Sequence, residues 1–351
     1  MTIDKNALQQ LLVNELVPYV KNVDEEAYYA KEYLVQLGKR GFLKSTHKTP
    51  EEIVEDGCTL VYETSKICMT TAFCLWCHLA ALTYIRHTAN HKLQAKLLEP
   101  LETGLAMGAT GLSNPMKFYA DLEKLYLTAE RTETGYVING ILPSVSNLGH
   151  DHWFGALAQV DDGTEVMFII NTTDPRIVLK EKAHFIGLNG SATYACKFTN
   201  VIVSNDDILA HDARHFCTII RPYFIAYQIP LGLGVMNATV QCIEKVKGKQ
   251  NGSNQYLPLQ ASDILEKERL FQQRLQHIIN KPVLADIIDL RLESAYATLE
   301  ATQASMLHNG SAGYIAGSVS SRKLREGYFY VNLTPTIRQL EKMTALRLQT
   351  S

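Results

Sequence analysis

The sequence has almost no net charge and no run of basic residues. Its 351 residues include 34 Lys and Arg against 36 Asp and Glu, which gives a formal charge of −2. Binding to nucleic acid without sequence preference needs clustered Lys and Arg that displace counterions from phosphates. We therefore expect no nucleic-acid partner.

A secretion signal and a disulfide framework are also missing. The N-terminal segment MTIDKNALQQLLVNEL lacks the basic start, the apolar block and the small-residue cleavage site of a signal peptide. Seven cysteines are an odd number for a disulfide scaffold. We expect a cytoplasmic protein with reduced, mostly buried cysteines.

One apolar segment is long enough to cross a membrane. Residues 67–85 contain no Asp, Glu, Lys or Arg, and as a helix they would rise about 28 Å, nearly the thickness of a bilayer core. Thr70, His78 and Tyr84 are among the residues that interrupt the segment, and no second span follows. We expect a buried core helix and no membrane partner.

The same segment contains Cys74, Cys77 and His78, in the C-x-x-C-H pattern of covalent haem attachment. The apolar setting explains two buried thiols without a cofactor, and no second ligand pair follows at zinc spacing. We expect no metal site. Phe73 and Trp76, three residues apart on one helix face, are most simply core residues.

Hydrophobic periodicity predicts three regions, 1–104, 105–211 and 212–351. The first is helical, with a capping signal at Thr49-Pro50-Glu51-Glu52. The second is mostly β, and Asn139-Gly140 and Asp161-Asp162-Gly163 are expected hairpin turns.

The helical period returns in the third region, where one helix is expected over 224–246 with a kink or break at Pro230. The fold class is therefore α+β multidomain: an N-terminal α-helical domain, a central β-barrel-like domain and a C-terminal α-helical bundle. Strands do not alternate with helices, which argues against a doubly wound parallel sheet.

Three segments in this order resemble the acyl-CoA dehydrogenase superfamily. Residues 111–115, GLSNP, resemble the family's T-E-P segment beside the flavin ring. Residues 136–147, YVINGILPSVSN, are similar to its Y-x-I-N-G-x-K-x-W-I-T-N stretch, which lines the flavin. Residues 187–203 resemble the end of its β-domain, and the likeness extends over essentially the whole chain. It implies the acyl-CoA dehydrogenase fold and a flavin-dependent oxidoreductase.

The resemblance implies FAD as the cofactor, with FMN or no flavin as the alternatives. Hydroxyl, amide and backbone groups in the matching segments could bind the nitrogen and oxygen atoms of the flavin, although Ser and Asn also favour turns for local hydrogen bonding. The flavin-contact candidates are Ser113, Asn114, Ser144, Val145, Ser146, Asn147 and Thr334.

The resemblance also implies an acyl-thioester or other small-molecule substrate, and a homodimer or homotetramer. Arg221 is the substrate candidate because its guanidinium could bind a carboxylate, although a salt bridge at a helix start explains it equally well.

The family's catalytic base is missing from both of its known places. The Y-E-G-T segment that carries a Glu corresponds to residues 331–334, with Asn332 at the position of the Glu. The alternative Glu-Arg pair corresponds to Ile220-Arg221. Neither an amide nor an alkyl group accepts a proton near pH 7, so the sequence identifies no catalytic base.

Segments that hold the cofactor in the family also differ. Residues 116–119, MKFY, replace a Gly-rich run, and Ser144 replaces a Trp that covers the flavin. Residues 249–252, KQNG, replace the R-x-x-F-G segment, and Leu307 stands where a Gln contacts the adenine half. These departures put binding of the adenine half in question.

Two other functions accommodate these departures. Two-component monooxygenases of the same superfamily use O2 and reduced flavin from a separate flavin reductase, and need no dehydrogenase Glu. His78 is similar in placement to a histidine used in that branch, although a core histidine bonded to a backbone carbonyl is the simpler explanation. The other alternative is a non-catalytic binding or scaffold protein derived from the family.

Overall fold

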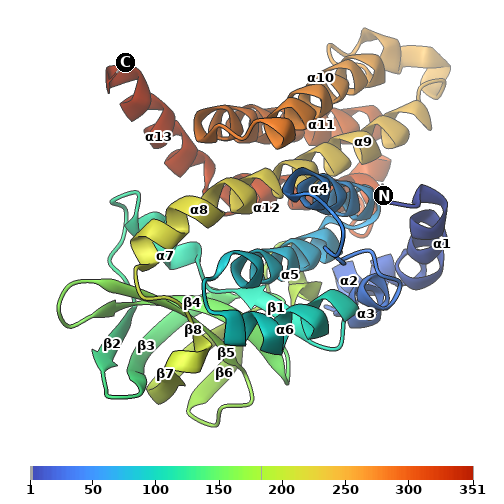
Figure 1. The fold of residues 1–351 in the computed structure, drawn as a ribbon. Helices are drawn as coiled ribbons and strands as arrows, with labels where there is room; N and C mark the ends of the chain where they lie inside the picture. Colours follow the sequence, from blue (N-terminus) through green and yellow to red (C-terminus); the bar gives the residue numbers. More distant parts are fainter. Residues whose placement is uncertain (1–2, 183, 351) are drawn as a thin grey trace.

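The computed structural model describes residues 3–182 and 184–350. The chain forms an N-terminal group of helices, a sheet and a C-terminal group of helices, and the sheet lies at one end of the molecule (Figure 1). The predicted order of helices, strands and helices is therefore confirmed. The N-terminal helices are α1 (Lys5–Glu15), α2 (Val20–Glu25), α3 (Lys31–Lys39), α4 (Pro50–Ile67), α5 (Met69–His87) and α6 (His91–Thr103).

The two central N-terminal helices have the predicted local structure. Thr49 caps α4, and a reciprocal hydrogen-bond pair with Glu52 completes the capping box. Helix α5 is buried from Met69 to Ile85, as expected of a core helix. Among the described residues one helical stretch, Ala213–Glu244, is long and apolar enough to cross a membrane, but 78% of its apolar window is buried inside the molecule.

The sheet has the strand order β6-β7-β3-β2-β4-β5-β8, and β1 pairs with β4 in parallel. It encloses a second hydrophobic core, separate from the one that the helices share. The short helix α7 (Ser113–Phe118) follows β1. The strands are β1 (Met107–Thr110), β2 (Leu127–Arg131), β3 (Gly135–Val145), β4 (His152–Val160), β5 (Glu165–Asn171), β6 (Ile177–Glu181), β7 (Tyr194–Ser204) and β8 (Ile208–Ala210).

One of the two predicted hairpin turns is wrong. Asp161-Asp162-Gly163 joins β4 to β5 as predicted. Asn139-Gly140 instead lies within β3, where the pairing with β7 shifts register. Gly140 has a φ of 130°, and a Cβ atom there would collide with the carbonyl oxygen of Tyr126. The glycine therefore permits a bulge and a close strand approach rather than a turn.

The C-terminal helices are α8 (Ala213–Ala226), α9 (Ile229–Glu244), α10 (Ala261–Asn280), α11 (Leu284–Gly313), α12 (Val319–Asn332) and α13 (Ile337–Thr350). The helix expected over 224–246 with a kink or break at Pro230 is interrupted, but the break lies at Tyr227 and Gln228 between α8 and α9, and residues 224–226 belong to α8. Pro230 lies in the first turn of α9, where its missing N–H removes no helical hydrogen bond.

Candidate functional site

A cleft of about 200 Å³ lies where the sheet meets the helices. One side comes from α5, α8 and α12, and the other from β1, α7, the end of β3 and the segment after α12. The lining residues are Phe73, Trp76, Cys77, Thr110, Ser113, Ser144, Ser146, Phe224, Phe329, Asn332, Leu333 and Thr334. Segments more than 200 residues apart in the sequence thus meet at one site.

The sheet side of the cleft carries hydroxyl groups. Ser113 Oγ lies 3.0 Å from Thr334 Oγ1, and Ser146 Oγ lies 2.7 Å from Thr193 Oγ1. Ser144 Oγ donates to the Pro143 carbonyl at 2.8 Å. A hydroxyl group has one donor and two acceptor lone pairs, so each of these groups keeps hydrogen-bonding capacity for a ligand.

The helix side of the cleft is aromatic. The rings of Phe73 and Trp76 stack, with centroids 5.6 Å apart and an interplanar angle of 15°. Phe224 meets Trp76 edge to face at 4.7 Å, and Phe329 meets Phe73 in the same way at 4.8 Å. The indole N–H of Trp76 donates to the Phe224 carbonyl at 3.0 Å. Three helices are therefore joined by one ring cluster.

The described lining of this cleft contains no charged side chain. Among the described residues that line it there is no Asp, Glu, His, Lys or Arg. The Cys77 thiol is buried, and burial raises its pKa well above the ordinary value. A cation contacts the lining, because Lys182 Nζ lies 3.3 Å from Ser144 Oγ.

Four of the predicted flavin-contact residues line the cleft together: Ser113, Ser144, Ser146 and Thr334. The other three lie behind its surface. The Asn114 side chain is buried and binds the backbone of Lys124 and Tyr126. Val145 is 1% exposed, in the sheet core.

Asn147 is fully buried and joins two parts of the fold. Its amide oxygen accepts a hydrogen bond from the Tyr29 hydroxyl at 2.6 Å, and its amide nitrogen donates to the Gly108 carbonyl at 2.8 Å. Its φ of 60° is left-handed, a conformation that Asn tolerates better than most residues. Asn147 therefore fixes the position of the neighbouring Ser146.

The catalytic candidate His78 does not line the cleft. It is 1% exposed, its Nδ1 accepts a hydrogen bond from the Gly108 N–H at 2.9 Å, and its Nε2 lies 3.0 Å from the Leu101 carbonyl. Both ring nitrogens are thus occupied by backbone groups in the neutral form. Burial lowers the pKa of the ring to about 4. We assign His78 a structural role.

Asn332 lines the cleft, whereas Arg221 does not. Asn332 lines the cleft at the end of α12, and its amide nitrogen donates to the Tyr328 carbonyl at 2.8 Å, leaving Oδ1 available. Arg221 lies on α8 outside the lining, and its Nε is buried without a hydrogen-bond partner among the described residues. Burial lowers the pKa of its guanidinium.

The sequence did not predict that aromatic residues line the cleft. Phe73 and Trp76 were predicted to be core residues, and they are only 5% and 3% exposed. The small exposed part nevertheless faces the cleft. Spacing along a helix cannot separate a core face from a pocket wall, because both are apolar with the same period.

No protein-family model matches the chain. Over 252 residues the chain is 22% identical to the probable acyl-CoA dehydrogenase FadE25 of Mycobacterium tuberculosis, a match that covers 67% of this chain and 64% of the relative. The matched region thus spans less than two thirds of that relative's length.

Solved structures resemble the whole chain. Butyryl-CoA dehydrogenase from Megasphaera elsdenii matches with a TM-score of 0.87 and 19% identity, over 99% of this chain and 100% of that one. PigA, solved with FAD and proline, matches with a TM-score of 0.85 and 16% identity, over 99% of each chain. These likenesses confirm the predicted fold.

Proposed function

We propose that this chain, a member of the acyl-CoA dehydrogenase superfamily, is a flavin-dependent oxidoreductase that binds its flavin in the cleft between α5 and the sheet. The observation that carries the proposal is the two-sided chemistry of the cleft. Aromatic rings and hydroxyl groups line one space, and the described lining residues include no charged side chain. A flat ring system with a polar edge complements such a space.

The residues present fit the flavin ring better than the rest of the cofactor. Ser113, Ser146 and Thr334 would bind its polar edge, and Trp76 and Phe73 would cover apolar surface. A bound flavin would supply electron-pair chemistry, and the protein would supply orientation and exclusion of water. FAD is the proposed form on the family resemblance. The departures at Leu307 and residues 249–252 leave FMN as the alternative.

An acyl thioester is the proposed substrate class, taken from the family. Dehydrogenation next to a thioester carbonyl needs a base that removes a proton. Asn332 stands at the family's Glu position and presents a neutral amide. This chain therefore lacks, among its described cleft residues, a group that could remove this proton near neutral pH.

The missing base favours a second candidate function, a monooxygenase that takes reduced flavin from a partner reductase and uses O2. Such a site needs to exclude water, and the aromatic helix side of the cleft is suited to that. A third candidate, a binding or scaffold protein without flavin, follows if the cofactor does not bind.

Anaerobic bleaching of the bound flavin separates the first two candidates. Wild-type protein loaded with FAD is mixed with butyryl-CoA and its visible absorption is followed. Because the base is missing, we expect no rapid bleaching of the flavin in wild type and faster bleaching in Asn332→Glu. The matched control is Asn309→Glu, on α11 and outside the cleft lining. Rapid bleaching of wild type would contradict the absence of a base, and tighter binding of reduced than of oxidised flavin would favour the monooxygenase.

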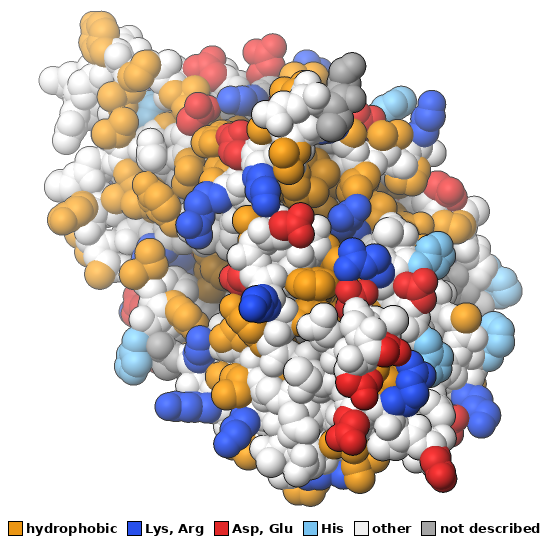
Figure 2. All heavy atoms as spheres, turned by 90° about the vertical axis from the view of Figure 1, so that its left-hand side faces the viewer, with side chains coloured by type: hydrophobic (Ala, Val, Ile, Leu, Met, Phe, Trp, Pro, Cys, Tyr) orange, Lys and Arg blue, Asp and Glu red, His pale blue; other side chains and the backbone are white. Residues whose placement is uncertain are grey.

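We further propose that the chain forms a homodimer or homotetramer through its C-terminal helices. Hydrophobic side chains gather in the upper half of the face in Figure 2, the half that holds these helices in Figure 1. Exposed apolar residues on α10 to α13 and their connections include Leu265, Leu270, Tyr296, Leu307, Tyr314, Ile315, Val319 and Leu348. Light scattering during gel filtration would test this, and a monomer at micromolar concentration would contradict it.

Cysteine usage supports a cytoplasmic location for the protein. All seven cysteines are unpaired, and six of them are buried. Unpaired thiols of this number are typical of reducing compartments.

A further inference from the structure

A second cavity, of about 320 Å³, lies at the C-terminal end of α5. Helices α4, α5 and α6 and the end of α8 contribute its lining, which shares no residue with the cleft. Its volume falls within the range of about 300–1,000 Å³ that is typical of small-molecule sites. We name it the second cavity and ask which ligand its side chains would fit.

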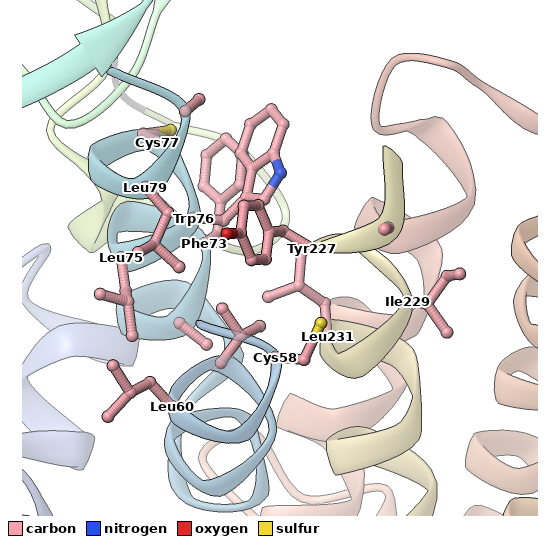
Figure 3. Packing of buried hydrophobic residues seen from close by; sticks show 14 of the residues in the cluster. Cys58, Leu60, Phe73, Leu75, Trp76, Cys77, Leu79, Tyr227, Ile229 and Leu231 are labelled. Carbon is pink, nitrogen blue, oxygen red and sulfur yellow. The ribbon is translucent and has the colours of Figure 1, made fainter. Parts of the chain in front are cut away.

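The second cavity contains a buried hydroxyl group without a partner. Tyr227 lines the cavity and is only 2% exposed, and its ring packs so closely on α4 that a Cβ atom at Gly57 would collide with it. Figure 3 shows its side chain directed towards α5. Burial raises the pKa of the hydroxyl, which therefore stays protonated, and the hydroxyl makes no hydrogen bond with any described residue. An unpaired buried hydroxyl is unfavourable, and a ligand in the cavity would supply the missing bond.

His87 adds a hydrogen-bond acceptor to the second cavity. Its Nδ1 lies 2.9 Å from the Thr83 carbonyl, which only accepts, so Nδ1 carries the proton and Nε2 keeps a lone pair. Burial lowers the pKa of the ring, which favours this neutral form. The ring of Tyr223 lies beside it, with centroids 4.8 Å apart, and the Tyr223 hydroxyl also makes no hydrogen bond with a described residue. The cavity thus offers one acceptor and two hydroxyl groups.

The charges around the second cavity are already balanced. Arg86 is the one permanently charged side chain among its described lining residues, and its Nη2 donates to Glu102 Oε1 at 2.8 Å. No carboxylate belongs to the described lining. Glu51, whose charge acts on Tyr223, is exposed to solvent and lies outside the lining. A charged ligand would therefore lose its hydration without gaining a free counter-ion.

We propose that the second cavity binds a small, uncharged molecule that carries a hydroxyl group on an apolar ring, of the class of phenols and cyclic alcohols. The ligand hydroxyl donates to His87 Nε2 and accepts from the Tyr227 hydroxyl, a combination that a carbonyl or an ether cannot provide. The apolar ring contacts the side of the cavity formed by Pro50, Ile53, Val54 and Leu98. The proposal goes beyond the flavin chemistry of the cleft and does not depend on it.

The test is a calorimetric titration with three probes that differ only in their polar group. We expect 4-ethylphenol to bind wild-type protein about fivefold or more tightly than 4-ethylanisole, which cannot donate, and than 4-ethylbenzoate, which is charged. Tyr227→Phe should weaken the binding of 4-ethylphenol about two- to tenfold, the equivalent of one hydrogen bond. His87→Phe should remove the preference for 4-ethylphenol over 4-ethylanisole, because Nε2 is lost.

Two variants control for effects elsewhere in the molecule. Tyr194→Phe, on β7 and outside both linings, removes another hydroxyl that makes no hydrogen bond with a described residue, and it should leave the affinity unchanged. Phe329→Leu alters the cleft and should also leave it unchanged. Thermal unfolding shows whether each variant is folded.

Three results would overturn the proposal: no binding of 4-ethylphenol at millimolar concentration, equal or tighter binding of either other probe, or an affinity that falls in Phe329→Leu but not in Tyr227→Phe. The last result would place the probe in the cleft. The titrations are run with and without added FAD. Failure of FAD to bind would refute the proposed function alone, because the second cavity shares no lining residue with the cleft.

Discussion

Lowering the pH should destabilise this protein through His78 before its carboxylates titrate. The ring is neutral in the fold, since Nδ1 accepts the Gly108 N–H and Nε2 donates to the Leu101 carbonyl. A proton added to Nδ1 would face an N–H donor and lose that hydrogen bond. Burial disfavours the charged form of the ring, so the folded state binds this proton poorly and the pKa falls from 6.5 to about 4.

The sign and size of the effect follow from linkage. Between pH 6.5 and about 4 the unfolded chain binds the proton and the folded chain does not, so stability falls as the pH is lowered. The contribution of His78 is complete above this window. At about 1.4 kcal/mol for each pKa unit, the full loss is about 3 kcal/mol. His152, with a pKa also lowered by burial to about 4, acts in the same direction.

Urea unfolding at several pH values across this window measures the effect. His78→Gln should be less stable than wild type near neutral pH and should lose less stability on acidification, because it cannot gain the proton. His215→Gln, at an exposed position on α8, is the matched control. A wild-type free energy of unfolding that stays constant across the window would refute the reasoning, and so would an unchanged pH dependence in His78→Gln. Either result would return His78 to consideration as a proton-transfer residue.

Three substitutions test the scaffold of the cleft by urea unfolding. Asn147→Ala removes the buried acceptor of the Tyr29 hydroxyl and should cost about 1–3 kcal/mol; a loss below the error of the measurement would contradict its structural role. Gly140→Ala should cost more than about 1 kcal/mol, because φ is 130° and a Cβ meets backbone, and an unchanged midpoint would argue against the bulge. Arg291→Ala should cost about 2 kcal/mol or more, because it removes a fully buried side chain and leaves the Gln228 amide oxygen and the Tyr330 carbonyl without their donor; wild-type stability in this variant would show that these contacts contribute nothing.

Local signals in the sequence were sufficient for much of the architecture. The capping box at Thr49 and the uncharged stretch that became α5 are short-range features, and the structure contains both. The Asn139-Gly140 prediction failed because the same dipeptide permits a turn or a bulge. The choice between them depends on strand pairing with β2 and β7, which is a long-range contact that the dipeptide does not encode.

The cleft shows the same division between local and long-range information. The hydroxyl residues Ser113, Ser146 and Thr334 were found through resemblance, and the structure brings them to one surface. The aromatic lining could not be found in this way, because Trp76 and Phe224 are 148 residues apart and each looks like an ordinary core residue. Only the folded structure shows that they pack against each other and line the same cleft.

Flavin binding at the hydroxyl side of the cleft is the central claim, and a calorimetric titration with FAD and with FMN tests it most directly. Wild-type protein should bind one of them, and the double variant Ser113→Ala, Ser146→Ala should bind it at least several-fold more weakly while unfolding at the same temperature. Absence of binding to the wild-type protein, in the oxidised and in the reduced state of both flavins, would contradict the account. Equal affinity in the double variant would show that the flavin lies elsewhere.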